Sequence, residues 1–230
     1  MKLIQGVLFQ DFYSDKKKSD RSSSLDLRNT KVLNLHWHSG FQTDGREELP
    51  QVSAFNAALP DSFISFSDRR KMLFSCGVHC YLYDYKIESV WNTPSSAISC
   101  LRKYQCVIAP DFSVFVDMPR ALNVWNIYRN RWVASYWQSE GINVIPSASW
   151  GNVDSFEYCF DGLPENSVIS VGHVAVGRDS SYRKLYRLGI ETLIERKHPD
   201  KLIVYGEPLG FYPETEVVYV EGKIQQLRKI

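Results

Sequence analysis

The sequence predicts an α/β protein with a mostly parallel sheet of about five to six strands and alternating helices. First, from about Cys76 onward, apolar strand-like runs alternate repeatedly with helix-like runs. Second, the strand-like runs lack period-two alternation, which is typical of parallel strands covered on both faces. Third, 44% hydrophobic residues and a net charge of +1 argue against a disordered chain and against a strongly basic nucleic-acid binder. An incomplete TIM-like barrel and an open sheet remain as alternatives.

Six short runs are candidates for the strands of this sheet. They are separated by helical patterns, so βαβ units with right-handed crossovers are expected. The last run is predicted to be an edge strand. The six runs are Val78 to Tyr83, Cys106 to Ala109, Asn143 to Pro146, Val168 to Val171, Leu202 to Tyr205 and Val217 to Val220.

Two helices are signalled clearly. In the first, Asp117 is the predicted cap, apolar and aromatic residues recur at helical spacing, and Gly141 supplies a stop. In the second, Asp179 or Ser180 is the predicted cap, and Pro199 ends the helix.

The domain organisation predicted is an irregular N-terminal extension, residues 1–75, packing on a main α/β domain of residues 76–230. No apolar run approaches the roughly 20 residues that span a bilayer, and no signal-peptide core follows the first residues. We therefore expect a cytoplasmic protein. The five cysteines are an odd number, mostly in or beside apolar runs, which indicates reduced thiols.

Ionisable and aromatic side chains follow the strand candidates. In a parallel sheet the carboxyl ends of the strands meet on one rim, where α/β proteins bind ligands. The sequence therefore predicts a shared pocket there. Its predicted catalytic residues are Asp84, Asp111 and Glu207, and its predicted ligand-binding residues are Phe112, Ser113, Arg129, Ser149, Trp150, His173 and Arg178.

Carboxylates that face one another in a cleft push their pKa values apart, which yields an acid and a base near neutral pH. The same oxygens can hold a divalent metal, although no cofactor is evident. Phe112 and Trp150 offer flat surfaces for a base or a sugar ring. The structural alternative is that each Asp caps the next helix or satisfies loop amides.

Two arginines suit an anionic ligand. Arg129 can reach back to Asp111 or bind an anion, although a structural ion pair is the simpler role. Arg178 lies in a loop that enters a helix, where free amides favour phosphate, but no Walker or G-x-G-x-x-G motif is present. Neither Cys76 to Cys80 nor His36 with His38 has the second arm of a zinc site.

Four segments of the chain form a distinctive pattern: YLYDYKIESVWNTP, IAPDFSVFVDMPRALNVWNIYRNRWVASYWQSEGINVIPSASW, FEYCFDGLPENSVISV and IVYGEP. They resemble the bacterial and phage family catalogued as a domain of unknown function, number 4417. The resemblance covers roughly residues 76–208. It implies an origin in phages, prophages or other mobile elements, and it brings no established activity, cofactor or catalytic residue.

Three functions follow as hypotheses. The first is a hydrolase or transferase acting on a nucleotide, nucleic-acid or sugar-phosphate substrate in the cytoplasm of a bacterial host cell. The second is a non-catalytic protein that sequesters a nucleotide-like ligand or engages a host, phage or replication protein. The third is nucleic-acid binding through a local basic face, against which the near-neutral net charge counts. That face would consist of Lys16 to Lys18, Arg178, Arg183, Lys184 and Arg187.

Overall fold

The computed structural model describes residues 34, 41–173, 180–206, 208–212 and 215–221. The chain divides into two compact units, Met1–Gly40 and Phe41–Ile230. Only Asn34 is described in the first unit, so the fold below is that of the second. The division at Gly40 differs from the predicted boundary at residue 75, because residues 41–75 contribute a strand to the main sheet.

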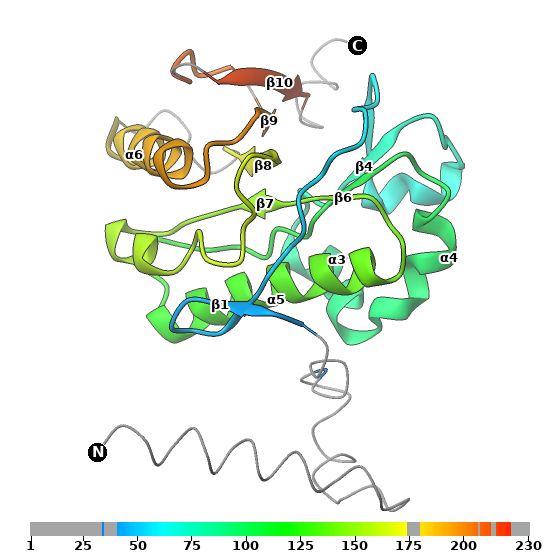
Figure 1. Ribbon diagram of the computed structural model, residues 1–230, viewed down its shortest axis with the longest axis horizontal. Helices are drawn as coiled ribbons and strands as arrows, with labels where there is room; N and C mark the ends of the chain where they lie inside the picture. Colours follow the sequence, from blue (N-terminus) through cyan, green and yellow to red (C-terminus); the bar gives the residue numbers. More distant parts are fainter. Residues whose placement is uncertain (1–33, 35–40, 174–179, 207, 213–214, 222–230) are drawn as a thin grey trace, which may run out of the picture. The chain divides into compact units, whose positions relative to one another are not determined.

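Parallel strands form two four-stranded sheets in the described part of the chain (Figure 1). The first sheet has the order β3-β4-β5-β6 and the second β10-β9-β8-β7, so neighbours in space are neighbours in sequence. The bounds are β3 Phe63–Ser65, β4 Gly77–His79, β5 Val107–Ile108, β6 Val144–Ile145, β7 Ser147–Ala148, β8 Val168–Gly172, β9 Lys201–Tyr205 and β10 Glu216–Val220.

The two sheets meet at Pro146, the only residue between β6 and β7. Its ring leaves it without an N–H to donate, but its carbonyl accepts a hydrogen bond from the Ser170 amide at 2.8 Å. Residues 144–148 therefore pair with β5 at one end and with β8 at the other.

Side chains from both sheets meet in one buried cluster. Ile108 and Ile145 of the first sheet pack there with Ile203 and Val220 of the second, so the sheets curve around a shared core. No pairing joins the outer strands β3 and β10 among the described residues, so the sheet is open rather than a closed barrel. The predicted α/β class with a mostly parallel sheet is confirmed, as is the edge position of β10.

Each predicted strand has a counterpart in the structure, but the chain also forms elements that the sequence pattern did not indicate. Strand β4 stops at His79 rather than at Tyr83, because a helix begins at Asp84. Strands β3 and β7 are too short for a periodic signal. The missed elements include an antiparallel hairpin of β1 (Thr43–Asp44) and β2 (Leu49–Pro50), which turns through Gly45 at a φ of 69°.

The helices are α3 (Asp84–Asn92), α4 (Ile98–Leu101), α5 (Arg120–Ser139) and α6 (Ser180–Lys197), with short 3-10 helices η3 (Phe66–Lys71), η4 (Pro94–Ala97) and η5 (Val153–Glu157). The prediction that Asp117 caps α5 is wrong: Pro119 is the cap residue, and no side chain bonds to the first turn. Gly141, at a φ of 77°, lies just past the end of α5 as predicted. Helix α6 begins and ends where predicted, and Asp179 lies outside the described residues.

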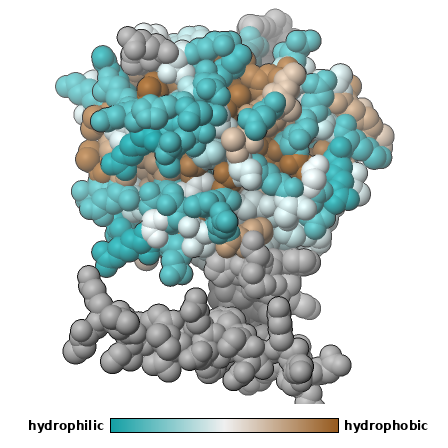
Figure 2. Space-filling view, viewed as in Figure 1, coloured by the Kyte–Doolittle hydropathy of each residue, from teal (hydrophilic) through white to brown (hydrophobic). Residues whose placement is uncertain are grey.

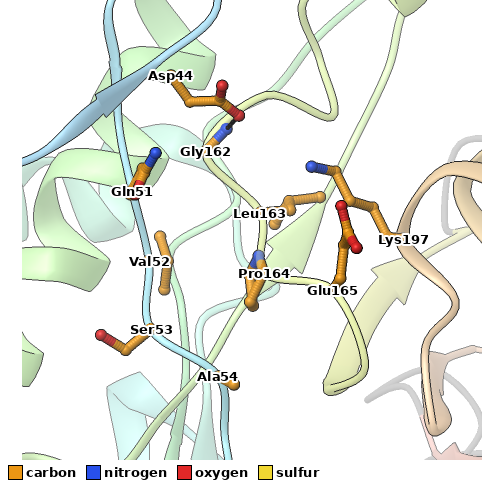
Figure 3. Close-up of a pocket in the computed structure, with 10 residues that line it drawn as sticks. All are labelled: Asp44, Gln51, Val52, Ser53, Ala54, Gly162, Leu163, Pro164, Glu165 and Lys197. Atoms are coloured by element: carbon orange, nitrogen blue, oxygen red, sulfur yellow. Dashed lines mark hydrogen bonds between the residues drawn. The ribbon is translucent and has the colours of Figure 1, made fainter.

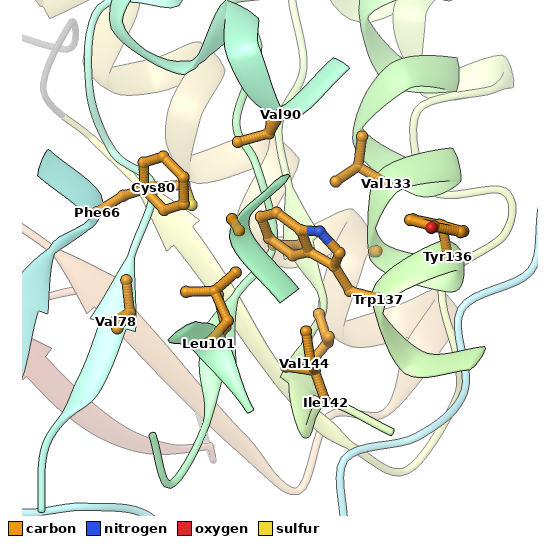
Figure 4. Close-up of a cluster of buried hydrophobic side chains, with 14 of the residues drawn as sticks. Phe66, Val78, Cys80, Val90, Leu101, Val133, Tyr136, Trp137, Ile142 and Val144 are labelled. Atoms are coloured by element: carbon orange, nitrogen blue, oxygen red, sulfur yellow. The ribbon is translucent and has the colours of Figure 1, made fainter. Parts of the chain in front are cut away.

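Helices cover the outer faces of the sheets. Helices α3 and α5 bury Val90 and Trp137 in one cluster with Val78 and Val144 of the first sheet (Figure 4). Helix α6 covers the second sheet with Tyr186, Ile190 and Leu193. Because both faces of the strands are covered, the strand sequences are apolar throughout.

The outer surface is mixed in polarity. The face seen in Figure 2 is mostly hydrophilic, with apolar residues in separate patches. None of the helices within the described ranges is long and apolar enough to cross a membrane. All five cysteines are unpaired, and Cys80, Cys106 and Cys159 are buried.

Candidate functional site

The segments that follow β4, β5, β7 and β8 lie on the rim formed by the carboxyl ends of the strands. They carry Asp84, Asp111, Ser149 and His173, in the chain order that the strands impose. Because all these strands run in the same direction, their ends share one edge of the sheet. The four segments therefore lie along one edge, as predicted from the strand order. The contacts of their side chains differ from one residue to the next.

Asp111 is the most perturbed acid on this rim. Its side chain is half-buried, and Oδ1 has no hydrogen-bond partner among the described residues. Burial raises the pKa of Asp111 to about 7, against a hydrogen bond from Ser149, with a further upward push from the charge of Asp84. The charge of Arg131 opposes the rise in the pKa. The pKa of Asp111 therefore lies much closer to neutral pH than that of an ordinary aspartate.

Three asparagines of α5 position the segment that carries Asp111. Asn123, Asn126 and Asn130 lie at i, i+3 and i+7, which places them on one face of the helix. Asn130 accepts from the Phe112 amide at 2.7 Å and donates to its carbonyl, and Asn123 makes the same reciprocal pair with Phe115. Asn126 donates to the Ser113 carbonyl at 2.6 Å. The three side chains thus bond backbone amides and carbonyls of residues 112–115, as a neighbouring strand would in a sheet.

Asp84 and Ser113 lock the loops after β4 and β5 together. The Asp84 carboxylate accepts from the Ser113 hydroxyl at 2.8 Å and from the Ser113 amide at 3.1 and 3.2 Å. Asp84 is also the first residue of α3, where the free amides of the first turn favour a negative charge. The observed role of Asp84 and Ser113 is thus to position the rim.

The inner side of the rim is lined by residues that sequence reasoning missed. The Tyr81 hydroxyl lies 2.8 Å from the Ser170 hydroxyl, and the Tyr81 ring stacks on Tyr205 with 4.7 Å between centroids. A Cβ on Gly172 would lie 2.8 Å from the Tyr81 ring and 3.6 Å from Asp111 Oδ2, so only glycine fits beside both. The sequence contained one indication of this arrangement: His79 and Tyr81 are two residues apart, the spacing that places side chains of an extended chain on the same side.

His79 is a buried histidine whose ring lies next to the Tyr81 and Tyr205 rings. Its ring centroid lies 4.7 Å from that of Tyr205, and its Nδ1 has no partner among the described residues. Burial lowers the pKa of His79 to about 4, against an opposing effect of Asp68. His79 thus stays uncharged at neutral pH.

The outer side of the rim is aromatic. Trp150 and His173 both pack against Tyr186 of α6, with ring centroids 5.3 and 6.1 Å from the Tyr186 ring. Phe211 contacts Tyr186 from a third side at 6.1 Å. The structure therefore brings the predicted residues Trp150 and His173 together through a tyrosine that the sequence analysis did not select.

Arg129 and Phe112 lie in the packed layer between helix and sheet. The Arg129 guanidinium lies 3.8 Å above the Phe112 ring, pairs with Glu88 at 3.1 Å and donates to Asn126 at 2.6 Å. Phe112 is fully buried. The structure thus gives both residues packing and ion-pair roles, and the simpler role considered for Arg129 is the one observed.

Arg131 is the cation whose charge reaches Asp111. It is 1% exposed, and its guanidinium donates to the carbonyls of Ser147, Cys159 and Asp161 at 2.7, 2.7 and 3.1 Å. Burial lowers its pKa to about 10. These bonds tie α5 to β7 and leave Arg131 a structural cation.

Two predicted residues, Arg178 and Glu207, lie outside the described residues. Within the described ranges, no three His, Cys, Asp or Glu side chains gather closely enough to hold a metal ion. A divalent metal at the carboxylates of Asp84 and Asp111 stays a prediction.

A separate cavity of about 460 Å³ lies at the amino ends of the strands (Figure 3). It is formed by the turn before β8, the last turn of α6 and the segment after β2. The Gly162 amide donates to Asp44 on its wall at 2.9 Å. None of the predicted site residues lines it. The lining residues are Asp44, Gln51, Val52, Ser53, Ala54, Gly162, Leu163, Pro164, Glu165 and Lys197.

The fold and the rim define an open, mostly parallel α/β protein with an acidic and aromatic cluster at its strand ends. The chain belongs to the family described as Domain of unknown function (DUF4417), which it matches over residues 41–221. The resemblance stated from the sequence is thus confirmed, and the match begins at the boundary between the two compact units.

Two phage proteins are similar to part of the chain. The Gene 1 protein of Mycobacterium phage D29 is 40% identical over 129 residues, which is 56% of this chain and 48% of that protein. The Gene 1 protein of Mycobacterium phage L5 is 38% identical over 130 residues, 56% of this chain and 57% of that protein. The matched region spans about half the length of these relatives. No solved structure matches the chain.

Proposed function

We propose that the carboxyl-end rim is an active site in which Asp111 transfers a proton, in a hydrolase or transferase acting on a nucleotide, nucleic-acid or sugar-phosphate substrate. One observation carries this: a half-buried carboxyl, with one oxygen unpaired and its pKa raised to about 7 by burial, lies at a strand end. A general acid or base works best when its pKa lies near the working pH. The phage relatives support a setting in the cytoplasm of a bacterial host cell.

The surroundings of Asp111 support this role. Burial and, to a lesser extent, the charge of Asp84 raise the pKa of Asp111, Ser149 bonds its carboxyl, and the asparagines of α5 fix the backbone that carries it. Gly172 lets the Tyr81 ring and Asp111 Oδ2 lie close to its backbone, since a Cβ there would meet the ring at 2.8 Å. A substrate group that reaches Oδ1, the oxygen without a partner among the described residues, would meet an acid that can either give or take a proton near pH 7.

Turnover tests this proposal. Wild type, Asp111→Asn and the exposed control Asp117→Asn are incubated with nucleotides, nucleosides, sugar phosphates and short oligonucleotides, with and without Mg²⁺ or Mn²⁺, and products are separated chromatographically. We expect turnover in wild type and in Asp117→Asn, and a loss of about 10²- to 10⁴-fold in Asp111→Asn. Absence of turnover on every substrate, or an unimpaired Asp111→Asn variant, contradicts the proposal.

A non-catalytic binding protein is the second candidate function. It is favoured by Asp84, whose carboxylate already accepts hydrogen bonds from Ser113 and so is not free to act as a second acid or base. Such a protein would sequester a nucleotide-like ligand or engage a host or replication protein. A ligand that binds tightly and is recovered chemically unchanged supports this candidate, whereas multiple turnover excludes it.

A further inference from the structure

Exposed aromatic side chains gather on two neighbouring loops of the rim. Five aromatic residues are exposed in the described part of the chain, and three of them, Tyr83, Tyr85 and Phe115, follow β4 and β5. The other two, Tyr182 and Tyr219, lie on α6 and β10. Tyr83 and Tyr85 are the most open, at 71% and 73% exposed. Because single exposed apolar residues are common but groups of them are not, this concentration indicates an interaction surface.

Helix α3 holds its two tyrosines away from the sheet. Ile87, Val90 and Trp91 are the buried residues of this helix and define its inner face. Tyr85 lies two positions before Ile87, a rotation of about 200°, so its side chain is on the opposite face of the helix. Tyr83 stands just before the helix, at the cap position. Both rings therefore lie on the solvent side of the first turn.

The two tyrosine rings lie side by side with a cation next to them. The Tyr83 and Tyr85 rings are nearly parallel, with 10° between their planes and 5.8 Å between their centroids. The Lys86 ammonium lies 5.6 Å from the centroid of Tyr83 and 5.7 Å from that of Tyr85. We call these three residues the Tyr–Lys platform. It offers flat aromatic surface and one positive charge to the same ligand.

Lys86 is a cation without a counter-ion on this surface. The neighbouring carboxylates are engaged elsewhere, since Asp84 accepts a hydrogen bond from Ser113 at 2.8 Å and Glu88 pairs with Arg129 at 3.1 Å. Within the described ranges, Lys86 makes no ion pair. Its ammonium can therefore pair with an anionic group of a ligand whose flat part lies on the rings.

The Tyr–Lys platform is joined to the segment that carries Asp111. Asp84 stands between the two tyrosines in the sequence, and its carboxylate bonds Ser113, which lies two residues after Asp111. Phe115, 46% exposed, continues the same loop, and Asn123 holds its amide and carbonyl. A ligand on the platform thus lies beside the loop of the proposed acid, and exposed aromatic surface continues along that loop.

We propose that the Tyr–Lys platform binds single-stranded nucleic acid, with bases stacked on Tyr83 and Tyr85 and a backbone phosphate paired with Lys86. Proteins that bind single strands combine aromatic stacking surfaces with cations that contact the backbone. A duplex keeps its bases stacked on one another and does not offer their faces to a side chain. This inference deepens the proposed function and rests on it, because it names single-stranded nucleic acid as the substrate class of the site that contains Asp111.

The near-neutral net charge of the chain, +1, fits this mode of binding. Stacking supplies affinity without many phosphate contacts, whereas binding dominated by the backbone needs a strongly basic surface. With one phosphate contact, the logarithm of the binding constant should fall against the logarithm of the salt concentration with a slope of about −0.7. A slope of about −3 or steeper would mean four or more phosphate contacts and would contradict a platform of two rings and one lysine.

Binding of labelled oligonucleotides to the full chain tests the inference. The probes are oligo(dT) and oligo(U) of about 12 nucleotides and a DNA duplex of the same length, and binding is followed by fluorescence anisotropy. We expect at least one single strand to bind wild type at least about tenfold more tightly than the duplex. Absence of single-strand binding, or a duplex that binds as tightly as both single strands, overturns the inference.

Variants of the platform show whether its rings hold the strand. Tyr83→Ala and Tyr85→Ala each remove one stacking surface and should weaken single-strand binding by about 5- to 100-fold. The matched control Tyr85→Phe keeps the ring and should bind as wild type does. Tyr182→Ala, which removes an exposed tyrosine on α6, should also leave binding unchanged. Lys86→Gln should make the salt slope shallower by about 0.7.

Two results of these variants overturn the inference. One is single-strand binding that is unchanged when Tyr83 and Tyr85 are both replaced with Ala. The other is self-association of the chain that the same double variant abolishes while single strands do not bind, which makes the platform a protein interface. Because both side chains are exposed, the double variant should keep a thermal unfolding midpoint close to that of wild type, so a loss of binding is not a loss of folding.

Asp111→Asn separates the inference from the proposed function. If the inference holds, this variant binds the single strand as tightly as wild type, because Asp111 is not part of the platform. If mononucleotides or sugar phosphates are converted in an Asp111-dependent manner while single strands do not bind, the inference fails and the proposed function stands. If single strands bind through Tyr83 and Tyr85 but wild type converts none of the substrates, the proposed function fails and the platform is confirmed as a binding site alone.

Discussion

Replacing Asp111 with Asn should change the pH dependence of stability in a direction that identifies a buried acid. The pKa of Asp111 is raised from 3.8 to about 7 on folding, so the folded state holds this proton more tightly than the unfolded state. The stability from the protonated carboxyl is fully present below pH 3.8 and is lost as the pH rises through 7. The Asn side chain carries no such proton and should show no such loss.

The magnitude follows from the size of the pKa change. A rise of about three units corresponds to about 4 kcal/mol between the two pH extremes. Of this, about 2.5 kcal/mol falls between pH 5 and pH 8, because ionisation in the unfolded state is nearly complete at pH 5 whereas the folded protein ionises only above it. Wild type should therefore lose about 2.5 kcal/mol more stability over this interval than Asp111→Asn.

Urea unfolding at pH 5 and pH 8 measures this difference. The free energy of unfolding is obtained for wild type, for Asp111→Asn and for Asp117→Asn, an exposed carboxylate of the same loop. Other titrating groups are shared and cancel in the comparison. A difference below about 0.5 kcal/mol between wild type and Asp111→Asn, which is the typical scale of a surface substitution, would refute the reasoning that Asp111 is a buried, perturbed acid.

Three further predictions concern residues around the rim. The lowered pKa of His79 means that the folded protein holds a neutral imidazole, so its contribution to stability is lost as the pH falls from 6.5 through 4. Between pH 7.5 and pH 5, wild type should therefore lose about 2 kcal/mol more stability than His79→Gln, which urea unfolding at both pH values checks. Asn130→Ala leaves the buried Phe112 amide without its acceptor and should cost about 1 to 3 kcal/mol in a urea titration, with equal stability contradicting the role of the helix. Gly172→Ala places a Cβ 2.8 Å from the Tyr81 ring and should cost about 1 to 3 kcal/mol; an unchanged thermal unfolding midpoint would show that the ring moves freely.

The sequence predicted the parallel sheet well because its strands are buried on both faces and read as apolar runs. Val168 to Val171 and Leu202 to Tyr205 therefore appear almost unchanged as β8 and β9. Strand β3, within residues 41–75, was not predicted because it is only three residues long and gives no periodic pattern, although it pairs with the next strand along the chain, β4. The cap of α5 was mispredicted because Pro119 stands at the cap position before Arg120, and no side chain caps the first turn.

The candidate site was predictable where it depends on strand direction alone. Asp111, Ser149, Trp150 and His173 follow strands, and parallel pairing puts them on one rim. The order of residues along the chain does not show how deeply each side chain is buried. Phe112 and Arg129 pack between helix and sheet, whereas Tyr186 reaches the rim from the middle of α6. The spacing of Asn123, Asn126 and Asn130 was the overlooked pattern, since one helix face with three amides indicates a backbone held along it.

The central claim is that a carboxyl poised near neutral pH lies on the strand-end rim, and a carbon-13 NMR titration of the Asp111 side chain tests it without a substrate. The Asp111 signal is assigned by its absence in Asp111→Asn and followed from pH 4 to pH 9. The account predicts a midpoint of about 7. A midpoint near 4, the ordinary value for an exposed aspartate, would contradict it and leave Asp111 with only a structural part in the loop after β5.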